Sequence, residues 1–168
     1  MKKFELTTES ITNVAGKKLF RIKALIDFED VKAGELGGYV EKEGNVSQDG
    51  DAWVSDNAKV FGNARISDNA RISDNARISG NARISGNAWV SGDADYTLIQ
   101  GFGTEFRCTT FYRGKNKKIM VNCGCFHGDL EEFRKQVKET RNGKIAKEYL
   151  MIADLMEYHF TGEGSDDE

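Results

Sequence analysis

Residues 52–95 are built on a six-residue unit that repeats without a gap. Each unit begins with alanine and carries valine or isoleucine two positions later. The seven complete copies read AWVSDN, AKVFGN, ARISDN, ARISDN, ARISGN, ARISGN and AWVSGD. A period this strict indicates stacked repeats and not an ordinary globular domain, because every copy must bury the same face against its neighbours.

Each unit carries the pattern of a short strand followed by a corner. Small or branched side chains alternate with charged or polar ones over four residues, which is strand periodicity. The next two residues are mostly Asp-Asn or Gly-Asn, and such residues tolerate the positive φ of a corner. Three strands and three corners close one coil of 18 residues, and stacked coils pair their strands in parallel. The sequence therefore predicts a mainly β chain with a short parallel β-helix, its inner wall made of alanine and valine or isoleucine.

The hexads resemble those of left-handed β-helix, or hexapeptide-repeat, proteins. That resemblance implies the left hand of the coil, and it implies a homotrimer or a multiple of one, since such proteins are usually trimers. The hexads, the glycine-rich stretch and the phrase DVKAGELGGYV at residues 30–40 are also similar to a group of small phage- and prophage-encoded β-helix proteins. This second resemblance implies a phage protein located in the cytoplasm of the host cell.

Four regions follow from these patterns. We expect an N-terminal β-hairpin cap at residues 1–35, the β-helix at 36–98, a C-terminal ββαα module at 99–160 and a disordered acidic tail at 161–168. Alternation at residues 4–8 and 19–26 predicts the hairpin, because an exposed sheet end needs a cover. The spacing is irregular only near residues 48–50, where two extra residues predict either an end-capping bulge or a short pocket-forming loop.

Turn and capping signals divide the C-terminal module. Residues 104–113 and 117–123 read as a hairpin around Gly-Lys-Asn. Asp129, with Glu132 three residues later, predicts the start of a first helix. A second helix follows the Arg-Asn-Gly break at residues 141–143.

The outward positions of the hexads are the candidate ligand-binding residues. They are Trp53, Lys59, Arg65, Arg71, Arg77, Arg83 and Trp89. Residues 18 positions apart stack in columns, so Arg71 is expected between two indoles, an arrangement that favours cation–π stacking. Like charges about 4.8 Å apart repel by roughly 0.9 kcal/mol even at the dielectric constant of water. This repulsion could be relieved by corner carboxylates, by a neighbouring subunit or by a bound phosphate. The columns therefore have two interpretations: a stabilising surface ladder or subunit contact, and a platform for a ligand.

The sequence offers little support for catalysis. Hexapeptide-repeat acyltransferases use a histidine base, and the two histidines here, His127 and His159, both lie outside the coils. Cys123, Cys125 and His127 alternate as Cys-x-Cys-x-His and are a weak alternative as zinc ligands, whereas Cys108 has no evident base partner. We therefore expect no enzymatic activity, no cofactor and no metal.

Composition narrows the partners and the compartment. A formal net charge of −3 predicts neither direct nucleic-acid binding nor membrane binding, and no apolar run is long enough to span a membrane. Three cysteines, with no secretory pattern at Met1, favour a reducing cytosol.

Three functional classes remain open. The first is a non-enzymatic phage-type binding protein that antagonises a host defence by sequestering a nucleotide-like signal or by binding a defence protein. The second is a structural virion or assembly component, and the third is an acyltransferase of the hexapeptide-repeat type. Rigid repeats suit the first two classes, and the third lacks its central histidine in the coils.

Overall fold

The computed structural model describes residues 1–162, and the chain divides into two compact units, Met1–Asp93 and Ala94–Glu168. Most of the predicted acidic tail, from residue 163 on, lies outside the described residues. Its first predicted residue, Thr161, is the last residue of a helix. No helix in the described part of the chain is both long and apolar enough to cross a membrane.

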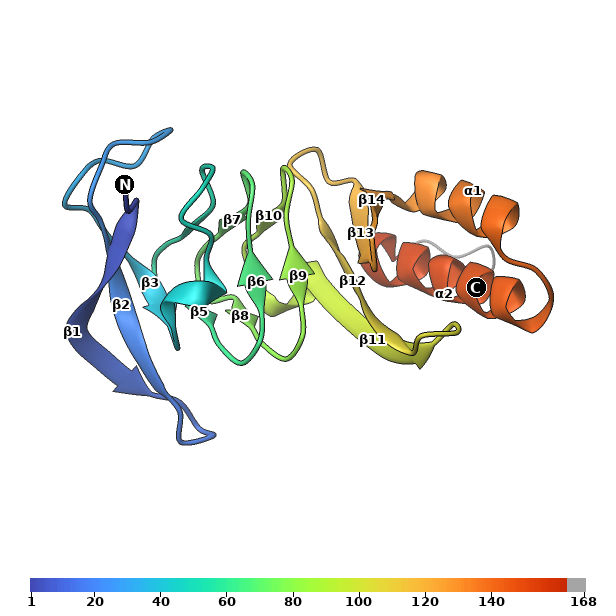
Figure 1. Cartoon of the computed structure of the whole chain (residues 1–168), viewed down its shortest axis with the longest axis horizontal. Coiled ribbons are helices and arrows are strands. Elements are labelled where there is room, and N and C mark those ends of the chain that lie inside the picture. Colours follow the sequence, from blue (N-terminus) through green and yellow to red (C-terminus); the bar gives the residue numbers. More distant parts are fainter. Residues whose placement is uncertain (163–168) are drawn as a thin grey trace. The chain divides into compact units, whose positions relative to one another are not determined.

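The hexads of the first unit form a β-solenoid (Figure 1). Its strands are β4 (Trp53–Val54), β5 (Lys59–Val60), β6 (Arg65–Ile66), β7 (Arg71–Ile72), β8 (Arg77–Ile78), β9 (Arg83–Ile84) and β10 (Trp89–Val90). They pair in parallel as β5 with β8, β6 with β9, and β4 with β7 and β10. Backbone N–H groups donate to carbonyls 17 residues further along the chain, as from Trp53 to Ala70 at 3.0 Å. The predicted repeated parallel strands are confirmed.

The inside of the solenoid is filled by the two apolar positions of every hexad. The buried residues are Ala52, Val54, Ala58, Val60, Ala64, Ile66, Ala70, Ile72, Ala76, Ile78, Ala82, Ile84, Ala88 and Val90, each at most 2% exposed. Burying a valine or isoleucine side chain stabilises the fold by about 1.5–3 kcal/mol. The predicted inner wall is therefore confirmed, and the arginines of the hexads point away from it.

The corners turn at the fifth residue of the first six hexads. Asp56, Asp68 and Asp74 have φ of 56°, 58° and 55°, and the glycines at positions 62, 80 and 86 have φ of 66°, 67° and 62°. The positive φ therefore falls on the Asp or Gly and not on the Asn that follows. The asparagines stack instead, as in the 3.3 Å hydrogen bond that Asn63 Nδ2 donates to Asn81 Oδ1.

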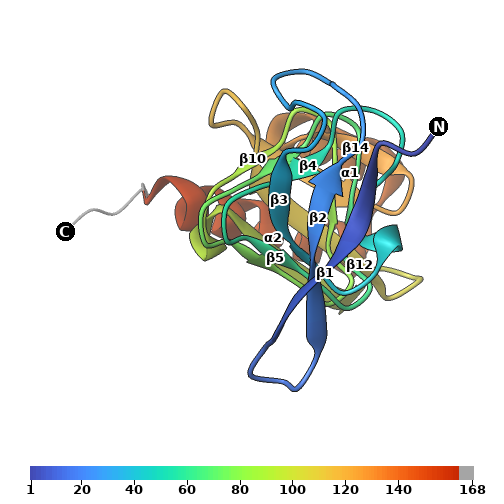
Figure 2. The same ribbon diagram turned by 90° about the vertical axis from the view of Figure 1, so that its left-hand side faces the viewer.

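Three strands lie against the N-terminal end of the coils. They are β1 (Phe4–Thr12), β2 (Lys18–Ala24) and β3 (Leu36–Val40). β1 pairs antiparallel with β2 and β2 with β3, and β3 then joins β5 in parallel. Figure 2, which turns this end toward the viewer, shows the three strands in front of the coils. β3 crosses very close to the first coil, because a Cβ at Gly38 would lie 2.5 Å from the Ala58 carbonyl oxygen.

Side chains complete the backbone hydrogen bonds where no earlier coil exists. Lys3 Nζ donates to the carbonyls of Gly50 and Ala52, at 3.1 and 2.7 Å. Asn45, the last residue of a 3₁₀ turn at Glu43–Asn45, donates through Nδ2 to the carbonyls of Gly62 and Ala64.

The irregular stretch at residues 48–50 belongs to the same end. Gln48 Oε1 accepts from the backbone N–H groups of Lys3 and Phe4, and its Nε2 donates to the Phe4 carbonyl. The first strand is therefore tied to the first coil at this point. Of the two alternatives for the irregularity, these bonds favour the end-capping bulge.

The second unit holds four antiparallel strands and two helices. They are β11 (Tyr96–Phe102), β12 (Arg107–Arg113), β13 (Ile119–Cys123), β14 (Phe126–Asp129), α1 (Leu130–Thr140) and α2 (Gly143–Thr161); a 3₁₀ turn at Asp93–Asp95 precedes them. The sheet order is β11-β12-β13-β14. The prediction of a ββαα module found the two middle strands and both helices, but it missed the outer strands. β11 directly follows the alanine period, and the predicted boundary at residue 98 divides it between the coils and the module. β14 is short and contains Gly128, so its alternation is weak.

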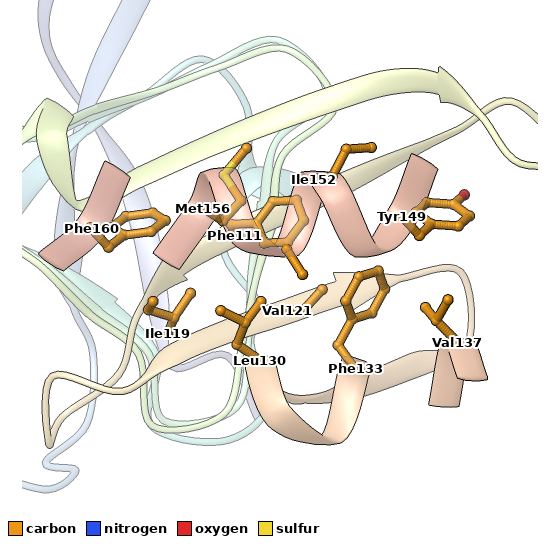
Figure 3. Packing of buried hydrophobic residues seen from close by; sticks show 11 residues of the cluster. Phe111, Ile119, Val121, Leu130, Phe133, Val137, Tyr149, Ile152, Met156 and Phe160 are labelled. Carbon is orange, nitrogen blue, oxygen red and sulfur yellow. The ribbon is translucent and has the colours of Figure 1, made fainter. Parts of the chain in front are cut away.

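Both helices cover one apolar cluster with the sheet. Asp129 accepts the N–H of Glu132 at 2.8 Å and the Glu132 carboxylate accepts the N–H of Asp129, which confirms the predicted start of α1. Figure 3 shows side chains of α1 and α2 facing one another, with Phe111, Ile119 and Val121 of the sheet among them.

Replacement of Gly38 by alanine will lower the melting temperature, because the added Cβ meets backbone at 2.5 Å and β3 or the first coil must move. We expect a cost of about 1–3 kcal/mol, typical of overpacking. Gly44→Ala is the matched control, since a Cβ there meets nothing within 4 Å. Thermal unfolding followed by circular dichroism measures both, and equal melting temperatures for the two variants would contradict the close crossing.

Candidate functional site: the outward columns of the solenoid

Each face of the solenoid carries one column of outward side chains. Lys59 pairs in register with Arg77, and Arg65 with Arg83. On the third face Arg71 pairs with Trp53 on one side and Trp89 on the other. The columns predicted from the 18-residue period are therefore confirmed, but the surroundings of the three columns differ.

Trp53 is not available as a ligand platform. It points away from the inner wall, yet it is only 1% exposed. The rings of Phe4 and Phe28 lie edge-on to its indole, with centroids 6.3 and 5.4 Å away. The N-terminal segment thus covers the first residue of the column, which the pattern of the hexads alone could not reveal.

Arg71 is held by a carboxylate instead of by the indoles. Its Nη2 donates to Asp30 Oδ1 at 2.6 Å, and within residues 1–162 its guanidinium stacks on neither Trp53 nor Trp89. The hydrogen bond from Arg71, with its charge, lowers the pKa of Asp30. The expected cation between two indoles is therefore wrong as a stacking arrangement. Trp89 remains 51% exposed at the other end of the column.

Arg77, the last cation of the column on β5 and β8, is bound by Asp93. Its Nε and Nη2 donate to Asp93 Oδ2 at 3.0 and 2.6 Å, and its backbone N–H donates to Asp93 Oδ1 at 2.7 Å. Burial raises the pKa of Asp93, but the bonds from Arg77 and its charge outweigh it, and the net shift is downward. Lys59, in the same column, donates from Nζ to the Asn57 carbonyl at 3.2 Å.

The column on β6 and β9 is the most open of the three. Arg65 and Arg83 are both exposed and stand side by side in register. Across the described part of the chain, the Arg65 guanidinium makes no ion pair. The asparagine pairs Asn63–Asn81 and Asn69–Asn87 flank this face at its two corners. We call this surface, Arg65 and Arg83 with the flanking asparagines, the arginine face.

The predicted Cys-x-Cys-x-His strand does not exist. Cys123 ends β13, a tight turn at Gly124 (φ +61°) and Cys125 follows, and His127 lies on β14. The three side chains therefore do not alternate on one strand, because the chain reverses between them. His127 Nε2 lies 3.1 Å from the Tyr112 hydroxyl. Among residues 1–162 no group of three His, Cys, Asp or Glu side chains is placed to hold a metal ion.

Three residues that determine which columns stay exposed were not among the predicted site residues. Asp30 and Asp93 pair with two of the arginines, and Lys3 donates to the carbonyls of the first coil beside Trp53. Asp93 could have been expected, because it stands at the sixth position of the last hexad, where asparagine is the rule. Asp30 and Lys3 are separated from their partners by more than 40 residues and carried no local signal.

Lys3 is a buried cation beside the covered column. Its side chain is almost fully enclosed, at 2% exposure, and its ammonium lies 5.0 Å from the Phe28 ring centroid. Burial, opposed by Asp51 and reinforced by Arg71, lowers the pKa of Lys3 from 10.5 to about 8. A buried ammonium that donates to two carbonyls keeps this end of the ladder closed, although its charge is costly there.

The lowered pKa of Lys3 makes the stability of the fold depend on pH. Between pH 8 and 10.5, Lys3 is protonated in the unfolded chain and mostly deprotonated in the folded chain, so the free energy of unfolding should rise with pH in that window. Lys3→Met removes this rise, whereas Lys2→Met, at a neighbouring lysine that is 61% exposed, should retain it. Urea unfolding at pH 7 and pH 10 measures the difference. A Lys3→Met variant with the pH dependence of the unaltered protein would contradict the assignment.

Comparison with known proteins supports the solenoid. A family model described as YdcK beta solenoid repeat matches residues 64–77 and 76–92, which hold β6 to β10. A search of the curated proteins found no match. The chain is therefore similar to the YdcK repeat over these coils, and this similarity and the parallel ladders agree on a β-solenoid.

Proposed function

We propose that this chain is a non-catalytic binding protein that uses the arginine face to hold a phosphate-bearing, nucleotide-like ligand. The observation that carries the proposal is the contrast between the columns. Arg71 and Arg77 each have a carboxylate at 2.6 Å. Arg65, by comparison, is exposed and makes no ion pair within the described residues, and it stands beside Arg83.

Electrostatics favours an anion at this face. Arg65 is exposed and makes no ion pair within residues 1–162, and its strand lies about 4.8 Å from the strand of Arg83. Two unit charges at that separation repel by roughly 0.9 kcal/mol even in water. A phosphate relieves that repulsion, and guanidinium groups bind phosphate oxygens through paired, charge-assisted hydrogen bonds. The neighbouring Asn63, Asn69 and Ser67 add neutral donors for hydroxyl or base atoms of the same ligand.

The resemblance to phage-encoded solenoids supplies the setting of the proposal. In the cytoplasm of an infected host cell, such a protein would antagonise a defence by sequestering a nucleotide-like signal, or by binding the defence protein that carries it. The proposal includes no acyl transfer, because His127 and His159 belong to β14 and α2 in the second unit and not to the coils. The left hand of the coil and the role of the β1–β2 pair as a hairpin cap are parts of the same proposal, supported by the hexad pattern and by the antiparallel pairing.

Charge reversal on the arginine face should weaken ligand binding without unfolding the protein. We expect ADP-ribose or a cyclic dinucleotide to raise the melting temperature of the unaltered protein, and Arg65→Glu to weaken that binding at least tenfold. Lys59→Glu is the control, since it makes the same charge change on another face. Equal loss in both variants would indicate a general charge effect, and no stabilisation by either probe would contradict the proposed ligand class.

A homotrimer is the second part of the proposal, and native mass spectrometry tests it. The resemblance to hexapeptide-repeat proteins supports three copies, and Trp89 is half exposed on an otherwise covered column. We expect a trimer mass for the unaltered protein and smaller species for Trp89→Lys. Phe106→Lys, which changes an exposed aromatic residue of the second unit, should leave the trimer intact. A monomer at micromolar concentration would overturn this part.

A further inference from the structure

The second unit contains a small cavity that the arginine-face proposal does not use. Its volume is about 120 Å³, and its apolar lining comes from Phe102, Phe126, Phe133 and Val137. An apolar cavity of about 150 Å³ in a protein interior is large enough to bind benzene. The cavity here is somewhat smaller than that, so it has room for at most a single six-membered ring and not for a nucleotide.

Two exposed arginines, Arg107 and Arg141, are among the residues that line this cavity, and we take them as its rim. Arg107 lies against the turn between β13 and β14, where a Cβ at Gly124 would be 2.5 Å from Arg107 Nη1. Gly124 has φ of +61°, a backbone conformation that favours glycine at this turn. Arg141, the residue that ends α1, also lines the cavity. Glu105 is the carboxylate among the lining residues, so the rim carries a net positive charge.

Inside the rim, the polar groups are neutral. The Tyr149 hydroxyl hydrogen-bonds with Cys123, and the Cys123 sulfur accepts from Thr109 Oγ1 at 3.2 Å. Burial, and then the neighbouring Cys123, raise the pKa of Tyr149, so its hydroxyl keeps its proton at neutral pH. Figure 3 shows Phe133, Val137 and Tyr149 at the same end of the apolar cluster.

An apolar chamber of single-ring size with cationic groups only at its mouth matches one class of ligand. A ring or branched alkyl group gains free energy by leaving water for the phenylalanines, and a carboxylate gains charge-assisted hydrogen bonds from guanidinium groups. A neutral molecule of the same shape gains the first term alone. We propose that this cavity binds a small aromatic monocarboxylate, with its ring among Phe126, Phe133 and Val137 and its carboxylate at Arg107 and Arg141.

Titration of the full chain with benzoate, followed by ¹H–¹⁵N NMR, tests the proposal. We expect benzoate to shift the amide signals of Gly103 and Gly124 and to bind at least tenfold more tightly than benzamide, its neutral analogue of equal size. Arg107→Gln and Arg141→Gln should each weaken benzoate binding to near the benzamide level. The spectra themselves report whether each variant remains folded.

Lys138→Gln is the matched control, because it removes an exposed cation of α1 that does not line the cavity. It should leave benzoate binding unchanged. Equal affinities for benzoate and benzamide, shifts confined to other parts of the chain, or full benzoate affinity in both arginine variants would each overturn the proposal. None of these outcomes bears on the arginine face, which lies on the first unit and is tested with phosphate-bearing probes.

Discussion

A parallel solenoid depends on the termination of its hydrogen-bond ladders. Each coil offers N–H and C=O groups to the next, and the first and last coils have no neighbour on one side. At the N-terminal end, each of three faces is completed differently: β3 pairs with β5, Asn45 donates to two carbonyls, and the Lys3 ammonium donates to two others. Asp93 performs the corresponding task for the N–H of Arg77 at the other end. Buried polar groups at these ends are costly unless they are bonded, which explains why even a lysine is enclosed there.

Termination also determines which outward residues are left for function. The segment that brings Lys3 to the first coil carries Phe4 with it, and Phe4 packs with Phe28 against Trp53. Asp93, which accepts from a backbone N–H, simultaneously neutralises Arg77. Two of the three columns are therefore engaged in holding the solenoid together, and the arginine face is left exposed.

Features that follow from a local repeat or spacing could be predicted from the sequence. Features that depend on contacts between residues far apart in the chain could not. Period six was sufficient for the parallel strands and for the burial of residues such as Ile72 and Ile78, and one Asp–Glu spacing was sufficient for the start of α1. The burial of Trp53 was missed because the residues that cover it lie more than 20 positions away in the chain. The cavity of the second unit was missed for the same reason, since its lining comes from the β11–β12 turn, the β13–β14 turn and both helices.

Because of the corner carboxylates, an anion bound at the arginine face would have to be held by local contacts. Asp56 accepts the N–H of Asp74, and Asp68 accepts that of Gly86, so each aspartate repays its positive φ with a hydrogen bond between coils. Residues 51–95 hold six aspartates against one lysine and four arginines, and a nearly neutral surface attracts anions only weakly at long range. A nucleotide-like ligand would therefore be recognised by contact with Arg65 and Arg83 and not by the overall field. Salt should then affect its affinity less than in a basic nucleic-acid-binding protein, where many phosphates are neutralised at once.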